Sequence, residues 1–192
     1  MNKNQIEVEL KFEISDVKKL NTWLKKNAKL LFVNHQVDDY YAPAHRNFFD
    51  EKYPTEYLRL RQSGDEASIT YKKWYSTGKE KEYSHCDEFE TKLESKNAME
   101  KIFKVLDVKY LLTIDKTRSA YEYKNFEIEL DEVKELGYVC EIEIKGDFKS
   151  VDEARRQIMD LAKILGFGEA DRGDDLRMGY AYMLAKKKGL LK

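Results

Sequence analysis

The chain has 192 residues, enough for a single domain with a substantial core. Charged residues make up 37% of it, but 35 basic and 36 acidic residues nearly cancel, which argues against a nucleic-acid binder with a net basic surface. No apolar stretch approaches the length of a membrane span and the N-terminus lacks the apolar run of a signal peptide, so we expect a cytoplasmic protein with no membrane or nucleic-acid partner.

Alternating apolar and polar residues predict about eight strands along the chain. We expect them over residues 5–13, 36–41, 56–61, 68–74, 86–93, 112–121, 125–133 and 138–145. Short turns join several neighbours, so the sheet is predicted to be mostly antiparallel. No linker divides the chain, and we expect one domain over residues 1–192.

About four amphipathic helices are predicted between and after these strands. Ser15 is expected to cap the first, and Ser95 or Asn97 to begin the second. The third starts with a capping box at Ser150, and the last is expected over residues 174–188. Residues 42–56, which carry both prolines, are expected to form a loop.

A five-residue pattern of the form E-x-E-x-K occurs twice. It reads Glu7-Val8-Glu9-Leu10-Lys11 near the N-terminus and Glu141-Ile142-Glu143-Ile144-Lys145 near the end of the last predicted strand. On a strand, alternate side chains share a face, so each pattern places two carboxylates and one ammonium group together. Two such strands side by side would offer hard oxygen ligands to a divalent metal ion.

Other predicted strands also carry charges of one sign at every second position. The basic ones are Arg59 with Arg61, Lys72, and Lys116 with Arg118, and the acidic ones are Glu88 with Glu90, and Glu127, Glu129 and Asp131. A sheet with one solvated face also alternates charged and apolar residues, and for a single strand that explanation is the better one. A solvated sheet, however, usually mixes charge signs along a strand, because neighbouring like charges repel each other.

The repetition of like charges therefore favours a polar tunnel. We predict an α+β fold in which an eight-stranded, mostly antiparallel sheet closes into a β-barrel, with a charged interior and helices packed outside. Such an interior suits a polyanionic, metal-bound ligand, since Arg and Lys bind phosphate oxygens and paired Glu residues hold Mg²⁺ or Mn²⁺.

The ordered set of motifs resembles the CYTH domain family, also called triphosphate tunnel metalloenzymes. The resemblance covers most of the chain, from Glu7-x-Glu9-x-Lys11 through Leu58-Arg59-Leu60-Arg61 and Lys116-Thr117-Arg118 to Glu141-Ile142-Glu143. It implies an eight-stranded tunnel with helices outside. One departure lies at Cys86, where many members carry Arg two residues before a Glu-x-Glu pair.

The resemblance implies a role for each matching residue. The implied metal ligands for Mg²⁺ or Mn²⁺ are Glu7, Glu9, Asp131, Glu141 and Glu143. The implied triphosphate-binding residues are Lys11, Arg59, Arg61, Lys72, Lys116, Arg118 and Lys145. The implied catalytic residues are Lys11, Glu9 and Asp131, and further tunnel carboxylates are Glu88, Glu90 and Glu129.

Two reactions stay open on the sequence. The first is metal-dependent hydrolysis of tripolyphosphate, thiamine triphosphate or another organic triphosphate, and the second is cyclisation of ATP to cyclic AMP and pyrophosphate, as in class IV adenylyl cyclases. Hydrolysis requires fewer special features and is ranked first. A non-catalytic polyphosphate- or nucleotide-binding module is disfavoured because the first-choice carboxylates are all present. A homodimer is compatible with the sequence, which does not decide the oligomeric state.

Overall fold

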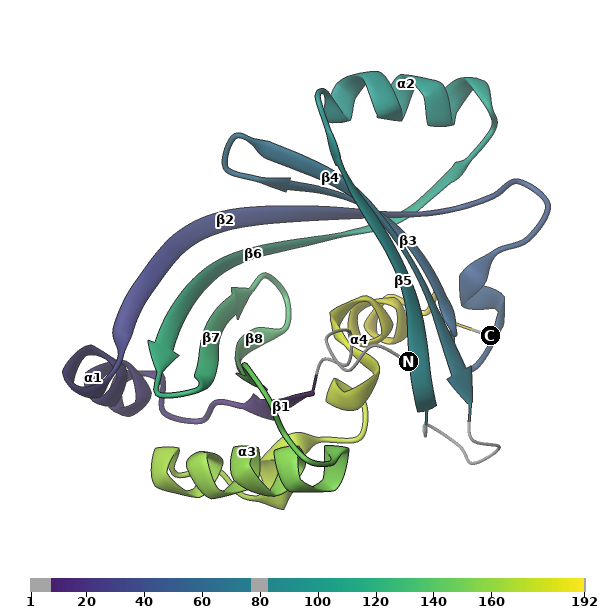
Figure 1. Ribbon diagram of the computed structural model, residues 1–192. Coiled ribbons are helices and arrows are strands. Elements are labelled where there is room, and N and C mark those ends of the chain that lie inside the picture. The colour runs from purple at the N-terminus through teal and green to yellow at the C-terminus, as the bar shows by residue number, and fades with distance from the viewer. Residues whose placement is uncertain (1–7, 77–82, 192) are drawn as a thin grey trace. The chain divides into compact units, whose positions relative to one another are not determined.

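The computed structural model describes residues 8–76 and 83–191 (Figure 1). The chain forms two compact units, each assembled from separate segments. Unit 1 comprises residues 1–33, 117–133 and 137–177, and unit 2 comprises residues 34–116, 134–136 and 178–192. The prediction of one domain over residues 1–192 stays a prediction.

Eight strands, counted over the described residues, form one sheet in the order β1-β8-β7-β6-β2-β3-β4-β5. They are β1 (Glu9–Glu13), β2 (Lys29–Ala42), β3 (Glu56–Ser63), β4 (Glu66–Ser76), β5 (Tyr83–Leu93), β6 (Lys109–Tyr123), β7 (Phe126–Val133) and β8 (Gly137–Ile144). The pairs β1–β8, β7–β8, β2–β3, β3–β4 and β4–β5 are antiparallel, as predicted. The strand order ends at β1 and β5, so the predicted closure into a barrel is not confirmed.

Four α-helices accompany the sheet in the described part of the chain, which confirms the α+β class. They are α1 (Val17–Asn27), α2 (Lys96–Val105), α3 (Val151–Leu165) and α4 (Tyr180–Lys187). Short 3-10 turns lie at η2 (Phe48–Asp50), η3 (Glu169–Arg172) and η4 (Leu176–Met178). Among these helices, none combines the length and apolar character needed to cross a membrane.

The core of unit 1 lies between its strands and the helices α1 and α3. Val8, which precedes β1, and Leu10 and Phe12 of β1 are 5%, 6% and 0% exposed. They pack with Ile128 of β7 and Ile142 of β8, both fully buried. α3 runs alongside β1 and covers this apolar face, which leaves the opposite, charged face of the strands for polar chemistry (Figure 1).

The core of unit 2 lies under α2. Leu60 of β3 is fully buried and packs with Tyr41 and with Phe103 of α2. The rings of Tyr41 and Phe103 meet edge to face at 5.0 Å between centroids. As in unit 1, alternation along the strand puts the basic residues beside Leu60 on the other face.

Two local predictions were wrong. α1 is capped by Asp16 and not by Ser15, because an Asp16 carboxylate oxygen accepts the Lys19 backbone N–H at 3.0 Å. The last α-helix begins at Tyr180, after Gly179, whose φ of 85° interrupts a helix that was expected from residue 174. The loop predicted over residues 42–56 is confirmed between β2 and β3, and it contains η2, whose Phe48 and Phe49 are buried.

Candidate active site

A row of three carboxylates crosses the charged face of unit 1. The strand register places Glu9 of β1 opposite Glu143 of β8, and Glu143 opposite Glu127 of β7. Like charges directly opposite each other destabilise a sheet unless a cation lies among them. Lys145 supplies one, because its ammonium nitrogen lies 2.6 Å from the Glu143 carboxylate and 3.9 Å from that of Glu127.

The next row combines carboxylates with an ammonium group. Lys11 of β1 lies opposite Glu141 of β8, and Glu141 lies opposite Glu129 of β7. The Lys11 ammonium donates to Glu141 at 3.1 Å and also pairs with Glu9. The side chain of Glu141 is only 9% exposed, so its charge depends on such partners.

Arg118 of β6 is the second cation in this network. Its Nε and Nη2 donate to the two oxygens of Asp131 at 2.8 and 2.6 Å, and Nη2 donates to Glu141 at 3.1 Å. It also pairs with Glu129. Asp131 is fully buried, and the two-point bond to a planar guanidinium is the arrangement that stabilises a buried carboxylate best.

Burial and the neighbouring charges shift the pKa values of Glu9, Lys11 and Arg118. Loss of solvent raises the pKa of Glu9; Lys11 opposes this shift and the Glu141 charge adds to it. Burial by itself would lower the pKa of Lys11, but the carboxylates of Glu141 and Glu9 outweigh it and raise that pKa. The same balance, with Asp131 as the main partner, raises the pKa of Arg118. Both cations are therefore charged at neutral pH.

The donor chemistry of this network fits a hard divalent cation, since its ligands would all be carboxylate oxygens. Among residues 8–76 and 83–191, however, no three acidic, histidine or cysteine side chains converge as a metal cage. Lys11, Arg118 and Lys145 hold the carboxylates instead. Glu7, one of the predicted ligands, lies outside the described residues. The metal site therefore stays a prediction.

The two arginines of unit 2, Arg59 and Arg61, lie on two different rows of its sheet. One row runs from Asp38 of β2 to Arg61 of β3, and the other from Arg59 of β3 through Thr70 of β4 to Glu90 of β5. The Arg61 Nε and Nη2 atoms donate to the two Asp38 oxygens at 2.6 and 2.7 Å. Burial by itself would raise the pKa of Asp38, but the hydrogen bonds from Arg61 and the nearby positive charges lower it.

Arg59 is held at three points and still has an unused donor. Its Nη2 donates to the Thr70 hydroxyl at 3.0 Å and to Glu90 at 3.4 Å, and its Nη1 lies 3.6 Å from Asp38. Its Nε–H is buried and has no hydrogen-bond partner within the part of the chain that the structure describes. Such buried orphan donors are rare in native proteins, so this atom is a candidate for ligand binding.

The other predicted residues of unit 2 lie on the same strands. The Lys72 ammonium is 2.7 Å from the Glu88 carboxylate on β5. Lys116 of β6 is 3% exposed, and its ammonium lies 5.1 Å from the centroid of the Tyr180 ring on α4. Cys86, the predicted departure from the family pattern, is half-buried and donates weakly to the Asp87 carbonyl at 3.4 Å.

The structure thus gathers the predicted residues into two sets. The unit 1 set comprises Glu9, Lys11, Arg118, Glu129, Asp131, Glu141, Glu143 and Lys145, and the unit 2 set comprises Arg59, Arg61, Lys72, Glu88, Glu90 and Lys116. Sequence reasoning missed Asp38 and Tyr180 as polar contacts of these sets. The alternation Gln36-x-Asp38-x-Tyr40 was the only signal for Asp38, and nothing local marks Tyr180.

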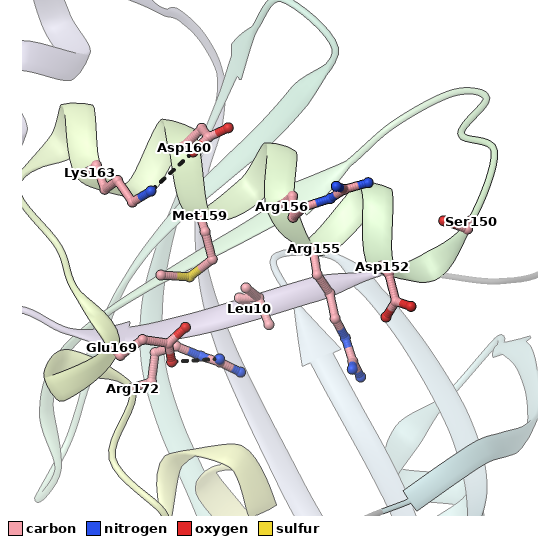
Figure 2. Close-up of a pocket in the computed structure, with 10 residues that line it drawn as sticks. All are labelled: Leu10, Ser150, Asp152, Arg155, Arg156, Met159, Asp160, Lys163, Glu169 and Arg172. Atoms are coloured by element: carbon pink, nitrogen blue, oxygen red, sulfur yellow. Dashed lines mark hydrogen bonds and ion pairs between the residues drawn. The ribbon is translucent and has the colours of Figure 1, made fainter.

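A cavity of about 790 Å³ in unit 1 is separate from these sets (Figure 2). It is lined by Leu10 of β1 and by residues of α3 and η3, and none of the predicted site residues lines it. Two ion pairs border it, Lys163 with Asp160 at 3.2 Å and Arg172 with Glu169 at 3.0 Å. It is therefore not the candidate active site.

Comparisons with known proteins give two findings on the sequence. The model of the CYTH domain family matches residues 5–173. A Methanocaldococcus jannaschii protein named putative adenylate cyclase is 32% identical over 166 residues, which cover 85% of this chain and 91% of that protein.

Solved structures show the same fold. A protein of Pyrococcus horikoshii OT3 matches with a TM-score of 0.72 at 23% identity, over 90% of this chain and 98% of that one. A Hippeastrum protein matches with a TM-score of 0.64 at 15% identity, over 96% of each chain. The latter is described as a putative adenylyl cyclase that reveals a dominant triphosphatase activity.

Proposed function

Because the chain belongs to the CYTH domain family, whose members act on small-molecule triphosphates, we propose that it is a divalent-metal-dependent triphosphatase. The proposed substrates are inorganic tripolyphosphate or a related organic triphosphate. Hydrolysis joins a water oxygen to the terminal phosphorus and breaks the bridging P–O bond. From tripolyphosphate it releases orthophosphate and pyrophosphate.

The observation that supports this proposal is that carboxylates and cationic side chains alternate in one network on β1, β8, β7 and β6. Glu141 accepts from Lys11 and from Arg118, each at 3.1 Å, so hard oxygen donors and phosphate-binding groups share one network. A site for a metal–triphosphate complex needs both kinds of group within a few ångströms. A purely structural ion-pair network would not require an excess of carboxylates.

We assign the following roles to the side chains. Glu9, Glu141, Glu143 and Asp131, together with Glu7, would hold Mg²⁺ or Mn²⁺, which when bound polarises phosphate oxygens as a Lewis acid. Lys11 and Arg118 would stabilise negative charge on the transferred and leaving phosphates. Lys145 in unit 1 and, considered separately, the basic set of unit 2 would bind phosphate oxygens, with the Nε–H of Arg59 as one donor in unit 2.

Adenylyl cyclisation is the second candidate, and one observation favours it. The relative that shares 32% identity with this chain over 91% of its own length is named putative adenylate cyclase. Against this, the protein from Hippeastrum named as a cyclase is described as having a dominant triphosphatase activity. A cyclase would also need the ATP 3′-hydroxyl aligned with the α-phosphorus, which is a further requirement. Hydrolysis therefore stays first.

Product analysis tests the proposal. The purified protein is incubated with Mg²⁺ or Mn²⁺ and, separately, with tripolyphosphate, ATP or thiamine triphosphate, and the products are resolved by chromatography. We expect orthophosphate from at least one triphosphate. Cyclic AMP and pyrophosphate from ATP would identify a cyclase instead, and tight binding without turnover would identify a non-catalytic module.

A further inference from the structure

Asp38 is an acidic residue among the basic side chains of unit 2. Its side chain is only 4% exposed and lies opposite Arg61 in the strand register. Both of its oxygens accept hydrogen bonds from Arg61, at 2.6 and 2.7 Å. A carboxylate at this place repels any anionic ligand that binds the neighbouring arginines. For Asp38 to favour binding, another effect has to outweigh this repulsion.

The hydrogen-bond geometry between Asp38 and Arg61 shows such an effect. Two parallel N–H···O bonds fix both the position and the plane of a guanidinium. Asp38 takes one donor each from Nε and Nη2 of Arg61, so this carboxylate sets the orientation of the Arg61 guanidinium. Asp38 also lies 3.6 Å from Nη1 of Arg59, which Thr70 holds from the other side.

Two effects of Asp38 on an anionic ligand have opposite signs. Its charge weakens binding by repulsion, whereas its hold on two flexible arginines strengthens binding, because their side-chain entropy is already lost before the ligand arrives. If removal of the Asp38 charge weakens the binding of an anionic ligand, the orienting effect is the larger one. If removal strengthens binding, repulsion is the larger one.

We propose that Asp38 is a positioning residue for triphosphate binding: it holds the guanidinium groups of Arg61 and Arg59 in the orientation that receives phosphate oxygens. This inference rests on the proposed function, which makes those two arginines phosphate ligands.

The test is the affinity of the Asp38→Asn variant for inorganic tripolyphosphate, measured by titration calorimetry without metal. Asparagine keeps the shape of the side chain but cannot accept both bonds from Arg61. Loss of orientation should weaken binding on the order of tenfold, the equivalent of one charged hydrogen bond. Unchanged or tighter binding would mean that Asp38 acts only by repulsion and would overturn the proposal.

Asp39→Asn is the matched control. Asp39 is the next residue on β2 and points to the other face, where it accepts from Thr113 and pairs with Lys96. Its replacement also removes a half-buried carboxylate from unit 2, but at a distance from the arginines. We expect its tripolyphosphate affinity to stay near that of the wild type. An equal loss in both variants would show a general effect on the fold and would contradict a positioning role.

A second readout needs no ligand. In the NMR spectrum of the wild type, the Arg61 Nε–H bonded to Asp38 should exchange slowly with solvent, and in Asp38→Ala, whose side chain has no acceptor, this protection should be lost. Protection that survives in the variant overturns the proposal. If the wild type neither binds nor hydrolyses tripolyphosphate, with or without added Mg²⁺, both the proposed function and the role of Asp38 fail. If it binds and Asp38→Asn binds equally well, only the role of Asp38 fails.

Discussion

Glu141 lies between two cations that come from different strands. Lys11 and Arg118 each donate to it at 3.1 Å, and its side chain is 9% exposed. A buried carboxylate that loses its partner is left with an uncompensated charge, which destabilises a protein far more than an exposed one. Each residue of this network therefore serves both the fold and the proposed chemistry, and substitutions that keep side-chain shape are the informative ones.

Glu9→Gln should abolish metal-dependent turnover while the fold stays intact. The amide keeps the shape of Glu9 but loses the charge that would hold a divalent cation. We expect turnover to fall by more than about 100-fold, since residues that only support metal ligands are already worth 10–100-fold. Glu66→Gln, in an exposed pair with Lys92, is the control. Full activity of Glu9→Gln would contradict the metal assignment.

Arg59→Ala should weaken tripolyphosphate binding by about tenfold or more, because a charged hydrogen bond contributes at least that much. Calorimetric titration measures the effect, and thermal unfolding checks that the variant is folded. Arg46→Ala, which removes an exposed partner of Glu56, is the comparison. Equal affinities of wild type and Arg59→Ala would place Arg59 outside the binding site.

Asp38 should make the free energy of unfolding depend on pH in the acidic range. Its pKa is below the ordinary value in the folded protein, so the stabilisation is present above the unfolded-state value of 3.8 and is lost as the pH falls through the folded one. We expect Asp38→Asn to lower the free energy of unfolding by about 3 kcal/mol at pH 7, as for a broken buried pair. Urea unfolding at pH 7 and pH 3 should show this difference shrinking at the lower pH; a constant difference would exclude the linkage.

At the scale of elements, the strand register brings charged residues that are far apart in the sequence next to one another. The pairing of β8 with β1 and β7 aligns Glu9, Glu143 and Glu127 in one row and Lys11, Glu141 and Glu129 in the next. A slip by one residue would move all of them to the apolar face. The buried residues of β1 and β8 prevent such a slip, so the hydrophobic core positions the charged face.

The cap of α1 can be tested directly against the sequence-based expectation. Asp16 accepts the Lys19 N–H at 3.0 Å, whereas Ser15 is exposed. Asp16→Ala should therefore lower the free energy of unfolding by about 1 kcal/mol, and Ser15→Ala should leave it nearly unchanged. Urea unfolding followed by circular dichroism measures both. The reverse ranking would restore Ser15 as the cap.

At the scale of the whole molecule, the two sets of charged residues belong to different compact units. Strands β2 and β6 run through both units, and the single sheet order includes strands of each. Barrel closure, the homodimer and the cytoplasmic location stay predictions. They concern the whole chain, and a contact within one unit does not test them.

Removal of metal should stop the proposed reaction in the whole protein. In excess EDTA we expect no turnover of tripolyphosphate, with activity restored by added Mg²⁺ or Mn²⁺, since the carboxylates then have no cation with which to hold the phosphates. EDTA saturated beforehand with the same metal as in the assay, which cannot remove that metal, is the control. Turnover that continues in excess EDTA would argue for a different chemistry.

The sequence alone determined the strands with clear period-2 alternation and the charged residues they carry. Val8, Leu10 and Phe12 are all buried, because every second residue of a strand must share a face, whatever lies next to it. The same rule groups Glu9 with Lys11 and Arg59 with Arg61 from their spacing alone. Boundaries that depend on a single bond or dihedral angle, such as the cap at Asp16 and the start of α4 after Gly179, were not determined in this way.

Only the tertiary structure decided which of these residues meet. Arg118 and Asp131 are 13 residues apart, and Asp38 and Arg61 are 23 apart, yet each pair shares two hydrogen bonds. Local propensity has no information about such partners, because strand order and register are set by the burial of the apolar face as a whole. Most of the charged groups could thus be predicted from the sequence, whereas their partners are set by the fold. Asp38 is one such partner, and the local pattern did not identify it.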